Sequence, residues 1–197
     1  QHMGLTGTYT IARIIVHPEN PDIVYVAAPG HEWTKNEERG VFKTTDGGET
    51  WEKVLYVSDN IGAADLVMDP SDPDTLYASA WNRIRRRWSD PMPGPGDGIF
   101  KSTDGGETWE LKVNGLPDLQ KTGRIGLDIA RSNPNVIYAY VDNHNPGRMA
   151  EAGERDAYGR QKQGRVIKGA EVYRSDDKAE TWYKVSPDTR YMEGFGG

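Results

Sequence analysis

Tryptophan and arginine side chains are concentrated in one short segment of the chain. Residues 81–88 read Trp-Asn-Arg-Ile-Arg-Arg-Arg-Trp. Aromatic rings stack on sugar faces or peptide side chains, and the planar guanidinium group of arginine binds carboxylates and phosphates. The candidates for ligand binding are therefore these residues together with one earlier tryptophan: Trp33, Trp81, Arg83, Arg85, Arg86, Arg87 and Trp88. Packing between neighbouring elements, with the arginines paired to acidic side chains, is the alternative interpretation.

A histidine beside a carboxylate forms a second group that could do chemistry. His31 and Glu32 are adjacent, and Glu37 and Glu38 follow closely. Such side chains can act as general acid and base, and glycoside hydrolysis needs two carboxyl groups roughly 5–10 Å apart. The four residues are the candidates for catalysis. A network of hydrogen bonds within one loop would explain them equally well.

Two short motifs recur three times in a fixed order. They predict the structural elements that carry the candidate residues. The motif Lys-Thr-Thr-Asp-Gly-Gly-Glu-Thr-Trp and its variants occupy residues 43–51, 101–109 and 175–182. A motif rich in proline, asparagine and aspartate precedes each copy, at residues 17–25, 69–77 and 131–138. Two motifs that alternate in this way indicate one structural unit repeated three times.

Each unit is predicted to contain four short strands. The expected ranges are 14–16, 23–28, 40–43 and 51–57; then 66–68, 75–80, 98–101 and 109–113; and finally 125–129, 136–141, 170–173 and 182–185. Four-stranded antiparallel units at this spacing are typical of β-propeller blades, so we predict an all-β propeller fold with about three blades. No segment keeps an apolar period of 3.6 residues, so almost no helix is expected.

The blade boundaries follow from the repeat. We expect residues 4–59, 60–121 and 122–190 to form blades one, two and three. Residues 1–3 are predicted to be the remnant of an expression tag, and residues 191–197 a tail or the start of a further blade.

Strand direction decides which connections share a face. The turns of the two motifs should lie on one face of the blades, and the connections from second to third strand on the other. Those connections, residues 29–39, 81–97 and 142–169, are long and unlike one another, which is typical of segments that carry function. They hold the three tryptophans outside the repeated motifs. We expect residues 143–168 to form a flexible lid or a partner-binding arm.

The aspartate motif resembles the Asp-box, or BNR repeat, with the pattern Ser/Thr-x-Asp-x-Gly-x-Thr-Trp. The matching residues are Asp46, Gly48, Trp51, Asp104, Gly106, Trp109, Asp177 and Trp182, and Ala179 replaces the glycine of the third copy. We interpret each copy as a structural clamp of a hairpin turn, in which the carboxylate accepts backbone N–H groups. A calcium site or a catalytic acid is the alternative.

The chain as a whole resembles the bacterial sortilin-like Asp-box propellers, a secreted family often labelled glycosyl hydrolases or sialidases. Residues 11–18, 38–42, 62–70 and 173–177 carry this resemblance. It implies an extracellular or periplasmic protein. Its function would be a binding module or scaffold for a protein, peptide or glycan, or alternatively a glycoside hydrolase of the xyloglucanase or sialidase type.

Two departures from that family qualify the resemblance. Sialidases carry an early Arg-Ile-Pro motif, whereas the nearest stretches here, at Arg13 and Arg124, lack the proline. Members of the family are also much longer. We therefore expect either a fragment of a larger propeller, completed by further blades, or a subunit that self-associates.

Composition excludes several classes of protein. The chain has 197 residues and a net charge of −6, which argues against nucleic-acid binding through bulk charge. It has no cysteine, so disulfides and thiolate chemistry are excluded. No apolar run is long enough to span a membrane. We expect no metal and no cofactor.

Overall fold

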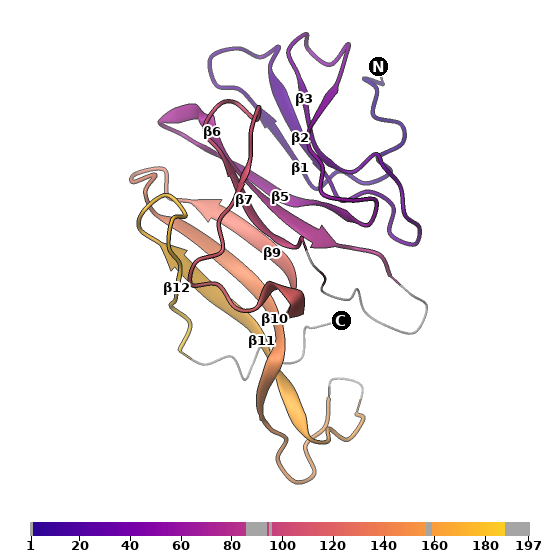
Figure 1. The fold of residues 1–197 in the computed structure, drawn as a ribbon, viewed down its shortest axis with the longest axis vertical. Coiled ribbons are helices and arrows are strands. Elements are labelled where there is room, and N and C mark those ends of the chain that lie inside the picture. The colour runs from indigo at the N-terminus through magenta and orange to yellow at the C-terminus, as the bar shows by residue number, and fades with distance from the viewer. Residues whose placement is uncertain (1, 86–93, 95, 157–158, 188–197) are drawn as a thin grey trace.

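Three four-stranded antiparallel sheets make up the structure (Figure 1). The computed structural model describes residues 2–85, 94, 96–156 and 159–187. Blade one comprises β1 (Arg13–Val16), β2 (Val24–Ala28), β3 (Gly40–Thr44) and β4 (Glu52–Leu55). Blade two comprises β5 (Ile61–Asp69), β6 (Asp72–Asn82), β7 (Gly98–Ser102) and β8 (Glu110–Leu111). Blade three comprises β9 (Thr122–Ile129), β10 (Ile137–Met149), β11 (Arg165–Ser175) and β12 (Tyr183–Lys184).

The prediction of an all-β fold built from four-stranded antiparallel units is confirmed. Within each blade the strands are hydrogen-bonded in sequence order. The helical content of the described residues is one turn of 3₁₀ helix, η1 (Leu119–Lys121), which leads into β9.

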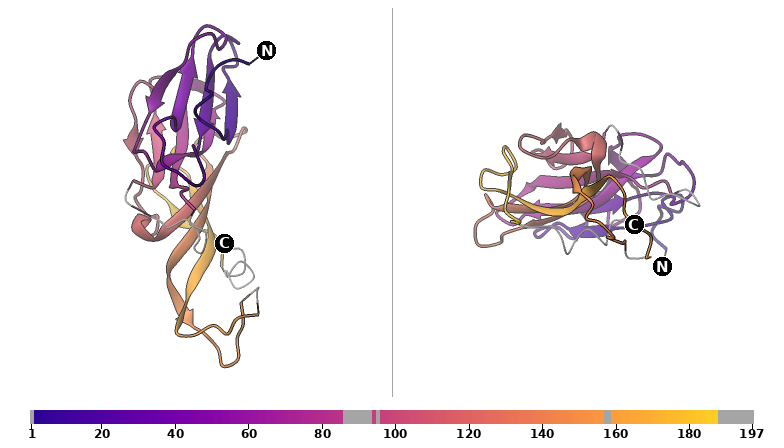
Figure 2. Two further views of the ribbon diagram at one scale, coloured as in Figure 1. Left: turned by 90° about the vertical axis from the view of Figure 1, so that its right-hand side faces the viewer. Right: turned by 90° about the horizontal axis from the view of Figure 1, so that it is seen from below.

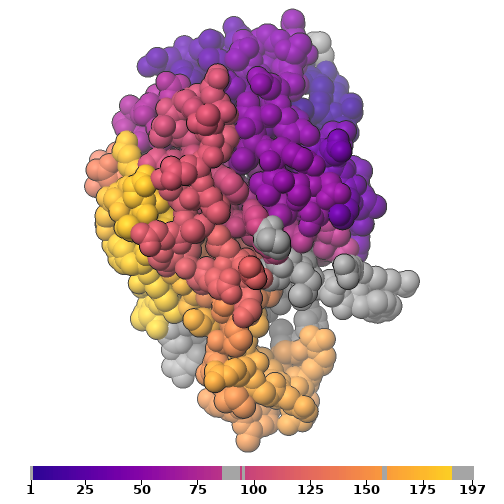
Figure 3. Space-filling model, viewed as in Figure 1, coloured from indigo at the N-terminus to yellow at the C-terminus, as the bar shows by residue number. Residues whose placement is uncertain are grey.

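Alternation of side chains along the strands builds the core between the blades. In the central strand β6, Leu76 and Ala78 belong to the apolar cluster shared with blade one. Tyr77, between them, belongs to the cluster shared with blade three. Successive side chains of a strand point to opposite faces, so one strand supplies both interfaces. In Figure 3 the atoms of blade two lie against those of blade one and of blade three.

The turns of the two motifs meet on one face of every blade, as the strand directions predict. The same backbone hydrogen bond occurs three times: from Gly47 N to Asp22 O at 3.0 Å, from Gly105 N to Asp74 O at 2.9 Å, and from Lys178 N to Asn135 O at 3.0 Å. We call this side the turn face. The opposite side, reached by the connections from second to third strand, is the loop face.

The connection in blade three differs from its prediction as a loop over residues 142–169. β10 and β11 continue as a paired ribbon that extends beyond the sheet (Figure 2). Asn143 pairs with Gly169, and Met149 pairs with Arg165. Shifts of register on both sides of Pro146 accommodate a residue that has no N–H group to donate. The sequence did not predict this ribbon, because its strands are rich in polar residues and no other sheet of the described chain packs on either of its faces.

The connection in blade two also starts later than predicted. β6 runs to Asn82, and Trp81 is therefore a strand residue paired with Gly62 rather than part of a loop. The outer strands β8 and β12 are two residues long, shorter than the expected ranges.

Two outward sheet faces carry apolar side chains that no further sheet of the described chain covers. Tyr25, Tyr77 and Tyr138 occupy one position of the repeat, and their exposed fractions are 1%, 0% and 38%. Tyr25 donates to Gly105 O of the next blade at 2.9 Å, whereas Tyr138 faces outward from blade three. This tyrosine position is thus buried in blades one and two and exposed in blade three.

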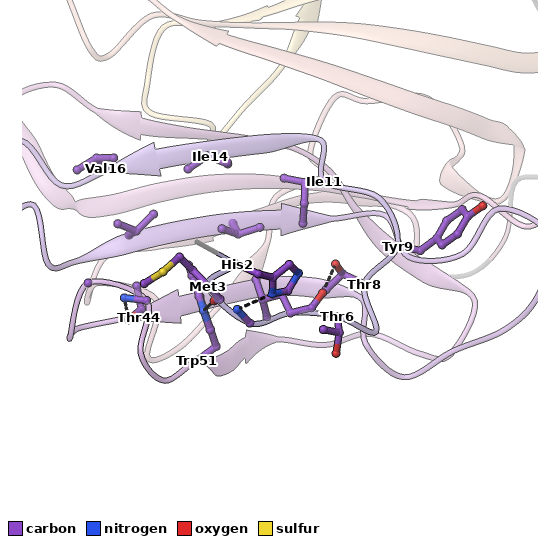
Figure 4. A pocket seen from close by; sticks show the side chains of 16 residues that line it. His2, Met3, Thr6, Thr8, Tyr9, Ile11, Ile14, Val16, Thr44 and Trp51 are labelled. Atoms are coloured by element: carbon purple, nitrogen blue, oxygen red, sulfur yellow. Dashed lines mark hydrogen bonds between the residues drawn. The ribbon is translucent and has the colours of Figure 1, made fainter.

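On blade one the outward face forms a cleft of about 570 Å³ (Figure 4). Ile14, Val16 and Val26 line it, and the segment around Met3 and Gly4 lies across it. The indole Nε1 of Trp51 donates to Met3 O at 2.7 Å. His2 and Met3, from the segment predicted to be a tag remnant, therefore cover part of this face.

One buried carboxylate joins all three blades. A shift of register at Ala64 in β5 sets the position of Asp65. Its Oδ1 accepts hydrogen bonds from Arg13 Nε of blade one and from its neighbour Leu66 N, each at 2.9 Å. Its Oδ2 accepts from Leu127 N of blade three at 2.9 Å. The first strands of the blades are thereby held at one common point.

We predict that Asp65→Asn destabilises the fold by about 2–4 kcal/mol, because the amide removes the charge and presents an N–H group to another donor. Urea denaturation measures the change. Asp128→Asn, the same substitution at an exposed position of β9, should stay within about 0.5 kcal/mol of the wild type. Equal effects of the two substitutions would contradict the role given to Asp65.

We also predict that the isolated chain self-associates through its outward faces, because exposed apolar sheet faces favour association. Light scattering over a concentration series should show a rising mean mass. Ile14→Asp, at a side chain in a residue 60% exposed, should reduce that rise without lowering stability. A monomer at every concentration would contradict the expectation.

Candidate functional site

A pocket of about 400 Å³ opens on the loop face where the three blades meet. It lies at the starts of the first strands, beside the connection that follows β2 and the end of β6. The residues that line it are Thr10, Ile11, Ala12, Pro29, Glu32, Ala64, Trp81, Arg83, Arg85 and Arg124. Four of the predicted site residues, Glu32, Trp81, Arg83 and Arg85, are thus brought together.

Glu32 and Arg85 connect blade one to blade two across this pocket. Arg85 N donates to Glu32 O at 2.7 Å, and Arg85 Nε lies 3.3 Å from Glu32 Oε1. Both side chains are partly exposed, at 42% for Arg85 and 28% for Glu32. Glu32 is held by a cation, so its carboxylate has a defined position in the pocket lining.

The loop that carries Glu32 is built around a buried arginine. Arg39 is fully buried, and its guanidinium donates to the backbone oxygens of His31, Thr34 and Asn36 at 3.0–3.2 Å and to Asn36 Oδ1. All of these acceptors are uncharged, and Arg39 Nη1 has no partner. Burial lowers the pKa of Arg39; the nearby Asp59 and Tyr56 act in the opposite direction, and the charge of Arg83 adds to the lowering.

The other residues proposed for catalysis lie away from the pocket. The ring of His31 contacts Tyr9, and its Nδ1 is 2.9 Å from Thr34 Oγ1. Glu38 lies beside Gly7, and the backbone oxygen of Glu37 accepts a hydrogen bond from a lysine of β4. His31 and Glu32 therefore do not form a pair facing one ligand.

The predicted ligand-binding residues separate into three groups. Trp81, Arg83 and Arg85 line the pocket, whereas Trp33 lies outside it with an exposed fraction of 59%. The remaining three, Arg86, Arg87 and Trp88, lie outside the described residues.

Trp81 has an unused hydrogen-bond donor. Its indole Nε1 is buried and has no partner within the described structure. An unpaired buried donor is unusual, and because this atom has almost no exposed surface, a ligand in the adjoining pocket reaches it only if neighbouring side chains move.

A buried aspartate ties the two ends of the loop after β6. Asp97 is fully buried and accepts hydrogen bonds from Asn82 N at 2.9 Å and Gly94 N at 3.2 Å. Burial raises the pKa of Asp97 to about 7, although the two backbone hydrogen bonds act in the opposite direction. No motif or spacing in the sequence indicated this role.

On the turn face, the three aspartate motifs form nearly identical turns. Asp104 accepts hydrogen bonds from the hydroxyl groups of Ser102 and Thr108 and from Thr108 N. The hydrogen bonds from Thr108 and Ser102 lower the pKa of Asp104 to about 2. Asp46 and Asp177 make the corresponding bonds in their own turns. These carboxylate oxygens are occupied by the turn itself.

The glycine of this turn has a conformational purpose. Gly48 and Gly106 have φ of +94° and +90°, and their N–H groups donate to the hydroxyl of the residue four positions earlier. Ala179 adopts φ of +68° at the same place and makes the same hydrogen bond. The third turn therefore keeps its geometry in a backbone region that disfavours a side chain.

The tryptophans of these motifs have different surroundings. Trp109 Nε1 donates to Gly106 O within its own turn at 3.0 Å. Trp182 is 4% exposed and packs in the core between blades two and three, where its Nε1 has no partner.

Two further findings concern the described part of the chain. It contains no group of three or more histidine, aspartate or glutamate side chains placed to hold a metal ion. It also contains no helix with the length and apolar character needed to cross a membrane.

No family model matches the chain. Over 195 residues it is 27% identical to the xyloglucanase Xgh74A of Acetivibrio thermocellus, a match that covers 90% of this chain and 20% of that enzyme. It is 29% identical over 93 residues to a probable oligoxyloglucan-reducing end-specific xyloglucanase of Neosartorya fischeri, covering 45% of this chain and 10% of that protein. The chain thus spans about a fifth of the length of the first relative.

Two solved structures resemble the fold. An ancestral GH74 enzyme superposes with a TM-score of 0.60 at 18% identity, covering 91% of this chain and 19% of the enzyme. The GH74 xyloglucanase from Xanthomonas campestris gives 0.57 at 16% identity, covering 90% and 22%. The three sheets are therefore blades of a β-propeller, similar to those of GH74 xyloglucanases.

The raised pKa of Asp97 predicts a pH dependence of stability. Between about pH 4 and pH 7 the folded state holds a proton on Asp97 that the unfolded state releases, so this residue lowers the unfolding free energy as the pH rises. Asp97→Asn should remove that contribution. Urea denaturation at pH 4.5 and pH 7.5 should show a stability gain of the variant over wild type that is larger at pH 7.5. A difference independent of pH would show that Asp97 is already ionised when folded.

Proposed function

We propose that this chain forms one wall of a carbohydrate-binding propeller and that the loop-face pocket is its sugar site. The observation that carries the proposal is the convergence of Trp81, Glu32 and three arginines from three blades on one pocket. Its volume, about 400 Å³, lies within the roughly 300–1,000 Å³ usual for ligand sites. The similarity to xyloglucanases supports a carbohydrate as the ligand.

The chemistry of the lining suits a sugar. The indole of Trp81 lines the pocket and offers an apolar face for a pyranose ring. Glu32 and the arginines supply an acceptor and further donors at the edge of that face. A protein or peptide ligand would be expected to need a broader surface than this pocket.

A glycoside hydrolase is the second candidate, and Glu32 is the residue that favours it. Hydrolysis requires a second carboxyl group roughly 5–10 Å from the first. Glu32 is the one carboxylate among the described residues that line the pocket, and it is paired with Arg85. We therefore assign sugar binding to this chain alone. Any hydrolysis would require a larger protein in which another wall of the site supplies the second carboxyl group.

Two broader assignments belong to the same proposal. The aspartate turns support membership of the Asp-box, or BNR-repeat, propellers of the sortilin-like type. A secreted location, extracellular or periplasmic, is supported by that resemblance.

The tryptophans provide a matched test of the site. Trp81→Ala should weaken the binding of a xyloglucan oligosaccharide by about tenfold, because a stacked ring contributes on the order of 1–2 kcal/mol. Trp33→Ala removes the same side chain outside the pocket and should leave affinity unchanged. Isothermal titration calorimetry gives the affinities, and Trp81→Phe separates the loss of the ring from any loss of stability. Equal affinities for Trp81→Ala and wild type would refute the site.

The two candidate functions, sugar binding and glycoside hydrolysis, differ in whether the chain cleaves its ligand. The chain incubated with xyloglucan should release no new reducing ends. Release that disappears in Glu32→Gln would establish the hydrolase instead, with Glu32 as its acid or base.

A further inference from the structure

The side chains of two of the three arginines in the pocket have no partner among the described residues. Arg85 is paired with Glu32, but the guanidinium groups of Arg83 and Arg124 make neither a hydrogen bond nor an ion pair to any described residue. The lining therefore carries three positive charges against one negative charge, a net of +2, in a chain whose net charge is −6. Such an excess at one concave site is electrostatically unfavourable unless an anion compensates it.

The surroundings strengthen the positive potential of the pocket. Arg39 is buried behind the Glu32 loop, and its hydrogen bonds go to uncharged oxygens. Burial is the main cause of the lowered pKa of Arg39; attraction to Asp59 opposes it, and repulsion from Arg83 adds to it. Asp65, the buried carboxylate that joins the blades, is already occupied by Arg13 and two backbone N–H groups.

The three blades hold these groups around one space. Arg124 projects from the start of β9, Arg83 follows the end of β6, and Trp81 lies between blade two and the pocket. A guanidinium group binds a carboxylate through charge-assisted hydrogen bonds, and an indole stacks on a pyranose ring. A sugar residue that carries a carboxylate matches both kinds of group at once.

We propose, resting on the function proposed above, that the pocket binds an acidic saccharide. The carboxylate of a uronic acid residue lies between Arg83 and Arg124, and its ring stacks on Trp81. Arg124 determines specificity for acidic over neutral sugars. The preference for a carboxylate distinguishes the pocket from a site suited only to xyloglucan, which is a neutral polysaccharide.

The test compares a galacturonic acid trisaccharide with a neutral xyloglucan heptasaccharide by isothermal titration calorimetry at low and moderate salt. The acidic ligand should bind more tightly and lose affinity as salt increases. Arg124→Gln and Arg83→Gln should each weaken its binding by about tenfold or more and leave the neutral ligand nearly unaffected. Arg131→Gln, at an exposed arginine in the turn after β9, is the matched control and should change neither. Thermal unfolding of each variant verifies that the fold is retained.

The possible results separate this inference from the proposed function. Binding of the neutral ligand alone, sensitive to Trp81→Ala, would overturn the acidic specificity and leave the sugar site standing. If Arg124→Gln and Arg131→Gln weakened binding of the acidic ligand equally, the binding would be general charge attraction, and the inference would be overturned. Failure of both ligands to bind would overturn the inference and the proposed function together.

Discussion

The carboxylate of Asp65 is the interaction on which the arrangement of the blades depends. It accepts hydrogen bonds from a side chain of blade one and from a backbone N–H group of blade three, while it belongs to blade two. Apolar contacts between sheets are not directional, and they would tolerate sliding of one sheet over another. A buried charge with fixed partners does not tolerate it, because each lost partner leaves an unsatisfied group. The starts of the first strands, and with them the walls of the pocket, are thereby set relative to one another.

The two faces of the blades use their charged groups differently. On the turn face, the carboxylates of the motif aspartates accept hydrogen bonds within their own turns. Lys101 and Lys112 of the same region are both paired with Glu180. On the loop face, the side chains of Arg83 and Arg124 have no such partners among the described residues, and they line a pocket together with Trp81. The motif aspartates are thus used within the turn face, whereas these two arginines remain unpaired on the loop face.

The fold was largely predictable because the repeat contains its own turn chemistry. Proline, glycine and aspartate mark every turn of the two motifs, and the apolar strands between them can only pair in order. The extended ribbon of β10 and β11 was not predictable, since its strands are polar and bury no sheet face. The pocket was predicted in part. Trp81, Arg83 and Arg85 were found from their local clustering, whereas Arg124 is a single arginine in an apolar strand 39 residues beyond Arg85.

The central claim is that a sugar ring lies against Trp81. The most direct measurement is a titration of the ¹⁵N-labelled chain with the saccharide, following the indole N–H resonances of its six tryptophans. The account predicts a large shift of the Trp81 signal, because a sugar ring stacks against its indole, and negligible shifts for Trp33 and Trp109. Shifts confined to Trp51, Trp109 and Trp182 would place the ligand on the turn face and contradict the account.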